Sequence, residues 1–81
     1  MKTIELKQFI EENSIEWHYS SSDEDVIMFV PFRNLKELTS MLSYSQISNV
    51  IRCVLKEDCI AIECRELLNY YGIELNEVFG I

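Results

Sequence analysis

The stretch NVIRCVLKEDCIAIECRELLNYYG, residues 49–72, decides the fold because it reads as a β-hairpin that continues directly into a helix. In its first part, Ile51, Cys53 and Leu55 recur at every second position, which is the period of a strand. Almost every other segment of the chain needs this apolar surface to pack against, so the prediction of the fold starts here.

A polar break at Glu57-Asp58 separates this strand from a second β-compatible run, residues 59–62. With these two residues as the loop, one face of the hairpin is apolar and must be covered by other elements. Cys59 falls on the opposite face from Cys53 and Cys64. The cross-strand pairs expected in this register are Lys56–Cys59, Leu55–Ile60, Cys53–Ile62 and Ile51–Cys64.

A helix is expected over residues 65–71, directly after the hairpin, with its apolar side chains on one side. Gly72 is expected to end it in the left-handed conformation that glycine adopts at low cost. Ile73 then occupies the position where a Schellman motif packs an apolar residue against Leu68.

The remaining elements follow from periodicity and turn residues. Leu6, Phe9 and Ile10 form a helical stripe, and Ile15, Trp17 and Tyr19 share one face of an edge strand. The expected elements are a helix over 3–13, strands over 15–20 and 26–30, a helix over about 34–42, the strands and helix of the hairpin stretch, and a short helical turn over 75–79. We predict a single α+β domain, residues 1–81, with αββαββα order, a four-stranded antiparallel sheet in the order 1-2-4-3, and helices largely on one face.

The composition restricts the partners that this chain can have. Its 81 residues include 14 acidic and 7 basic ones, for a net charge of −7. A direct nucleic-acid binder needs basic surface to neutralise phosphates, so that class is excluded. An acidic chain fits a basic protein partner, while solubility alone is the simpler explanation. No signal peptide or transmembrane stretch is evident, and three cysteines, an odd number, indicate reduced thiols in the cytoplasm.

Catalytic and metal-binding patterns are weak. Cys53, Cys59, Cys64 and His18 have zinc-ligand chemistry, but there is no Cys-x-x-Cys pair and the strand parity separates the thiols. His18 is the only histidine and lies on the polar face of a presumed edge strand, so it has no evident nucleophile to activate. Two glycines cannot form a glycine-rich phosphate loop. We therefore predict no enzyme activity, no cofactor and no metal.

Three segments carry a resemblance. The ending CRELLNYYGIELNEVFG, the opening MKTIELKQFIEEN and the strand DVIMFVPF, together with the order of elements, resemble small uncharacterised proteins carried by phages and prophages of Firmicutes. The resemblance implies life in the cytoplasm of a bacterial host cell. Small acidic phage proteins of this size include anti-CRISPR and other anti-defence inhibitors that bind a host protein, which is an analogy of size, charge and origin.

The sequence therefore favours a non-enzymatic acidic protein-binding module, a phage-encoded inhibitor that acts as a DNA mimic in the basic nucleic-acid channel of a CRISPR effector nuclease. Two alternatives remain: a small metal-stabilised domain, and a phage structural or regulatory accessory protein that forms a homodimer. The tyrosines are included as contacts because this residue type is enriched at interfaces. The candidate contact residues are Asp23, Glu24, Asp25, Glu57, Asp58, Glu74, Glu77, Tyr44 and Tyr70.

Overall fold

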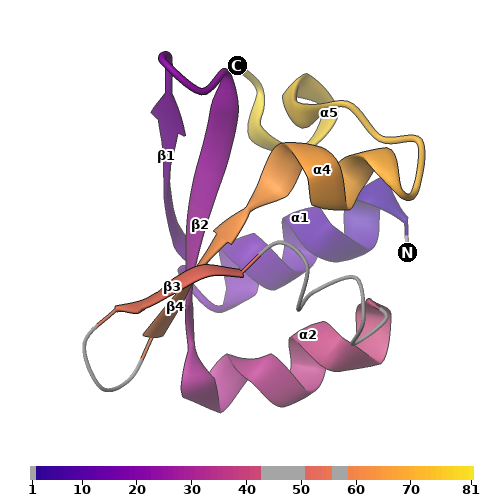
Figure 1. The fold of residues 1–81 in the computed structure, drawn as a ribbon. Helices are drawn as coiled ribbons and strands as arrows, with labels where there is room; N and C mark the ends of the chain where they lie inside the picture. The colour runs from indigo at the N-terminus through magenta and orange to yellow at the C-terminus, as the bar shows by residue number, and fades with distance from the viewer. Residues whose placement is uncertain (1, 43–50, 56–58) are drawn as a thin grey trace.

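An antiparallel sheet with helices packed against it forms the domain (Figure 1). A computed structural model describes residues 2–42, 51–55 and 59–81 of the chain, with the backbone alone for 51–55. The elements are α1 (Thr3–Glu12), β1 (Glu16–Ser20), β2 (Asp25–Pro31), the 3₁₀ turn η1 (Phe32–Asn34), α2 (Leu35–Met41), β3 (Ile51–Leu55), β4 (Cys59–Glu63), α4 (Cys64–Asn69) and α5 (Leu75–Phe79). The predicted α+β class is confirmed.

The central strand β2 pairs with β1 on one side and with β4 on the other, both antiparallel. β3 runs antiparallel beside β4, which gives the strand order β1-β2-β4-β3. The central position of β2 explains why residues 26–30 lack polar alternation, because four of these five residues are buried.

The register expected between β3 and β4 is wrong by one residue. Leu55 pairs with Cys59 and Cys53 pairs with Ala61, with an irregularity between Ile51 and Cys53. Three residues separate Leu55 from Cys59, so the two-residue loop on which the prediction depended does not fit this pairing. The predicted loop residues Glu57 and Asp58 themselves lie outside the described residues.

The hydrophobic core lies between one face of the sheet and the helices, which Figure 1 shows gathered on the same side of the strands. The predicted stripe of α1 is confirmed, since Leu6, Phe9 and Ile10 are all buried. From the sheet, β2 and β4 contribute alternate residues, as a pleated strand with one face toward a core requires. The sheet residues of the core are Val26, Met28, Val30, Ile60 and Ile62.

The edge strand β1 is covered less completely than its sequence predicts. Ile15 just before it is buried, but Trp17 is 37% exposed and Tyr19 is 46% exposed. Both lie opposite core residues of β2, Met28 and Val26, so they project toward the helices. The five-residue helix α5 covers this end of the sheet only in part, and each of the two aromatic side chains lines a hollow.

Candidate functional site

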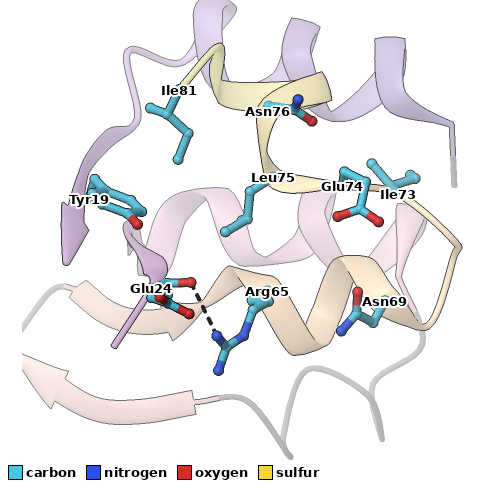
Figure 2. A pocket seen from close by; sticks show the side chains of 9 residues that line it. All are labelled: Tyr19, Glu24, Arg65, Asn69, Ile73, Glu74, Leu75, Asn76 and Ile81. Atoms are coloured by element: carbon cyan, nitrogen blue, oxygen red, sulfur yellow. Dashed lines mark hydrogen bonds between the residues drawn. The ribbon is translucent and has the colours of Figure 1, made fainter. Parts of the chain in front are cut away.

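A hollow of the described surface lies where the β1–β2 turn, α4 and the C-terminal segment meet (Figure 2). Its volume is about 720 Å³. We call it the tyrosine hollow, because Tyr19 forms its wall on the β1 side. Figure 2 shows the carboxylate-bearing Glu24 and Glu74 on different walls, with Leu75 between them. Its lining consists of Tyr19, Glu24, Arg65, Asn69, Ile73, Glu74, Leu75, Asn76 and Ile81.

Two carboxylates predicted to contact a partner therefore line one site. Glu24 comes from the β1–β2 turn and Glu74 precedes α5 at the other end of the chain, and both side chains are exposed. The apolar side chains of Ile73, Leu75 and Ile81 lie in the same lining. This combination suits a ligand group that has an aliphatic part and a positive charge, such as a lysine or arginine side chain.

Arg65 is the basic member of this lining. Its Nη1 donates a hydrogen bond of 3.3 Å to the backbone carbonyl of Glu24, which Figure 2 shows as a dashed line. The guanidinium thus holds the β1–β2 turn against the start of α4.

Asp25 is a structural residue, and its prediction as a partner contact is corrected. Its side chain is only 4% exposed. Its Oδ1 accepts hydrogen bonds from the backbone N–H of Val26 at 2.7 Å and of Arg65 at 2.8 Å. The second N–H belongs to the first turn of α4, where backbone donors lack partners within the helix and a carboxylate is favourable. A carboxylate that is buried and bonded in this way is not available to a partner.

The other predicted contacts are dispersed. Asp23 is exposed and accepts a hydrogen bond of 3.1 Å from the Ser20 hydroxyl. Glu77 is exposed and accepts a 3.1 Å hydrogen bond from the Glu74 backbone, which places both residues at the start of α5. Tyr70 is 43% exposed and donates to Glu66, one helical turn away, at 3.1 Å. Tyr44 lies outside the described residues, so the predicted aromatic patch with Tyr70 is not tested.

A second, smaller hollow of about 200 Å³ is lined on the β1 side by Trp17. We call it the tryptophan hollow. The Trp17 ring packs on the Phe79 ring with centroids 4.8 Å apart, a tilted arrangement favourable for aromatic pairs. Ile10 and Val78 add apolar surface, and Lys7 and Glu11 of α1 complete the lining.

The thiols differ in environment. Burial raises the pKa of the Cys64 thiol well above its ordinary value, and the nearby Asp25 carboxylate raises it further, so Cys64 stays protonated and is a poor nucleophile. Cys59 is half-buried, and the Cys53 side chain lies outside the described part. The strand register on which the parity argument against a metal depended is wrong, because Cys53 pairs with Ala61 and not with Ile62. Within the described residues, no group of three or more His, Cys, Asp or Glu side chains is placed to hold a metal ion.

The sequence did not indicate the residues that complete the two hollows. The alternation predicts that Tyr19 and Trp17 share one face of a half-buried edge strand, and Leu75 and Phe79 were predicted only to form a short helical turn. Their joint placement depends on how α5 crosses the end of the sheet. The short length of α5 was the available signal, since one and a half turns cannot cover two neighbouring large aromatic residues.

In residues 2–42, 51–55 and 59–81, the chain has no helix with the length and apolarity needed to cross a bilayer. Comparison of the chain with models of protein families, with curated proteins and with solved structures gives no match.

Proposed function

We propose that this chain is a non-enzymatic acidic protein-binding module that occupies a basic surface of a partner protein. The observation that carries the proposal is that Glu24 and Glu74 both line the tyrosine hollow. These two exposed carboxylates come from segments far apart in the sequence and lie beside apolar side chains.

The charge of the whole chain supports the same partner chemistry. A net charge of −7 on 81 residues produces a negative potential that accelerates encounter with a basic surface. Each exposed ion pair adds little affinity on its own, so many carboxylates must act together. The hollow adds apolar contact area, which a purely charged surface lacks.

In its sharpest form, the proposal is a phage-encoded anti-CRISPR or other anti-defence inhibitor. Effector nucleases hold their guide–target duplex in a positively charged channel that recognises the backbone of the nucleic acid. A compact acidic domain in that channel would exclude the nucleic acid. The resemblance of the sequence to small phage proteins and the charge support this version.

The test measures DNA cleavage by purified RNA-guided nucleases. The protein is added either before or after the nuclease is loaded with guide and target. We expect inhibition when the protein is added first, and much less when nucleic acid already fills the channel. Equal inhibition in both orders would contradict occupation of the channel. Failure to bind any basic effector surface would contradict the nuclease version.

Charge-reversed variants test the carboxylates. Glu24→Lys and Glu74→Lys should slow association with the nuclease, and the difference should shrink at high salt because ions screen exposed charges. Glu12→Lys is the matched control, since it makes the same change of charge at an exposed position of α1 outside the linings of both hollows. Equal association rates for all three variants would contradict the assigned site.

A further inference from the structure

We propose that the free edge of β1 is a docking strand for an extended segment of the basic partner. The segment would add a strand to the sheet and insert alternate side chains into the tryptophan hollow and the tyrosine hollow. This inference rests on the proposed function and specifies how the partner would be held.

The edge of β1 lacks three of the usual protections, which are lysine, proline and a β-bulge. β1 is the last strand of the sheet, and among the described strands it pairs with β2 alone. Its five residues, EWHYS, pair in an uninterrupted register without a bulge and contain neither lysine nor proline. Proteins normally blunt an exposed edge with such features because its backbone groups are a template for another strand. The edge of β1 is therefore suited to strand addition.

Two alternate residues of β1 line the two hollows. Trp17 lines one hollow and Tyr19 lines the other, and the two residues are alternate positions of the same strand. In an added strand, alternate side chains also point to one face and lie about 7 Å apart. Strand-adding domains take affinity from main-chain hydrogen bonds and specificity from pockets for alternate side chains.

The linings define which side chains fit. Ile10, Val78 and Phe79 give the tryptophan hollow an apolar floor, which suits an aliphatic or aromatic side chain. In the tyrosine hollow, Leu75 provides apolar surface, and Glu24 and Glu74 provide two negative charges against the one positive charge of Arg65. A lysine or arginine fits there, with its aliphatic stem on the apolar part and its cation near the carboxylates. The predicted motif is an apolar residue and a cationic residue separated by one position.

The probe that tests this motif is the capped heptapeptide TLTRTLT, which presents leucine and arginine at alternate positions in either chain direction. We expect it to shift the backbone amide resonances of residues 16–20 in the ¹⁵N-labelled full chain. We also expect nuclear Overhauser contacts between the peptide backbone and β1. The isomer TTLRLTT places leucine and arginine on opposite faces, and TLTETLT reverses the charge, so both should bind at least about tenfold more weakly.

A version of TLTRTLT that is N-methylated at every residue keeps its side chains and cannot donate main-chain hydrogen bonds. Its binding should be lost. Equal binding of the methylated and unmethylated peptides would overturn strand addition, as would the absence of any β1 shift with the unmethylated peptide. Shifts of β1 amides that depend on protein concentration alone would show a second copy on the edge and would also overturn the proposal.

Variants of the chain separate this inference from the proposed function. Trp17→Ala and Tyr19→Ala should weaken nuclease and peptide binding by roughly tenfold, the loss typical of a central aromatic contact. Phe32→Ala is the matched control, because this aromatic residue is about as exposed, at 42%, and lines neither hollow. If Glu24→Lys weakens nuclease binding while Trp17→Ala and Tyr19→Ala do not, the acidic module stands and the docking strand is refuted.

Discussion

Asp25 and Arg65 tie the β1–β2 turn to the start of α4. The Oδ1 atom of Asp25 accepts a hydrogen bond of 2.8 Å from the backbone N–H of Arg65, 40 residues further along the chain. The Arg65 guanidinium returns a hydrogen bond to the carbonyl of Glu24. Because Glu24 and Arg65 both line the tyrosine hollow, this connection fixes two of its walls relative to each other.

Replacement of Asp25 by alanine should lower the free energy of unfolding by about 1–3 kcal/mol, because the backbone N–H groups of Val26 and Arg65 both lose their hydrogen-bond acceptor. Urea unfolding followed by circular dichroism measures the change. Asp25→Asn keeps a carbonyl oxygen at this place and should cost less than Asp25→Ala. Glu12→Ala, which removes an exposed carboxylate, should change stability by less than about 0.5 kcal/mol. If Asp25→Ala is as stable as Glu12→Ala, the connection is not stabilising.

The role of Asp25 could not be predicted from the sequence because its acceptor atom serves a backbone donor far along the chain. In the run SSSDEDV it looks like one of several loop carboxylates. Other features could be predicted from local sequence patterns. The stripe of α1 is confirmed, and so is the left-handed conformation of Gly72, with a φ of +68° and a 3.0 Å hydrogen bond from the Ile73 N–H to the Leu68 carbonyl. The helix itself ends at Asn69, two residues before the predicted end at residue 71. Both confirmed features depend on residues within one or two helical turns.

Features that depend on a turn length or on two distant elements were predicted wrongly or missed. The register of β3 on β4 was wrong because the residues between the strands give no Asn-Gly or Asp-Gly signal that fixes a two-residue turn. Trp17 and Tyr19 were expected to share one face of a half-buried edge strand, and the alternation that marks such a strand does not say how far that face is covered. The extent of their cover depends on where a five-residue helix comes to rest, which no local pattern encodes.

Gly72→Ala should destabilise the protein by about 1–2 kcal/mol, the cost of a left-handed conformation for a residue with a Cβ atom. An added Cβ meets no other atom within 4 Å, so a steric clash does not contribute. Thermal or urea unfolding gives the measurement. Gly72→Asn should cost less, because asparagine tolerates this conformation better. Equal losses for alanine and asparagine would show that the backbone conformation is not the cause.

Stability should fall in alkaline solution through Cys64. Its pKa in the folded protein is raised above the ordinary value of 9.0, so the unfolded chain loses this proton first as pH rises. The unfolded state then binds fewer protons than the folded state, and the free energy of unfolding decreases. The contribution of the Cys64 thiol to the free energy of unfolding is complete well below pH 9. It falls by about 1 kcal/mol as the pH rises from about 9 to about 10.

Tyrosines and lysines titrate in the same range, so the informative quantity is the difference between the wild type and Cys64→Ala. The variant should be less stable at neutral pH because it leaves a cavity, and its disadvantage should shrink as pH rises. A pH-independent difference would contradict the raised pKa. Peptide mapping after brief alkylation of the native protein gives an independent check, since Cys64 should remain unmodified until the chain is denatured.

The pair of Trp17 and Phe79 makes the tryptophan hollow observable, because Trp17 is the only tryptophan in the chain. Phe79→Leu keeps an apolar side chain at a position that is 9% exposed and removes the ring that packs on the indole. We expect a red-shifted Trp17 emission, stronger quenching by acrylamide and a loss of about 0.5–1.5 kcal/mol of stability, the value of an aromatic pair beyond area burial. Phe32→Leu, at an exposed aromatic position away from Trp17, should leave the emission unchanged.

A peptide that fills the tryptophan hollow should shift the Trp17 emission in the opposite direction, to the blue, because it removes water from the indole. Identical emission and quenching in Phe79→Leu and the wild type would show that the two rings are not packed together in solution.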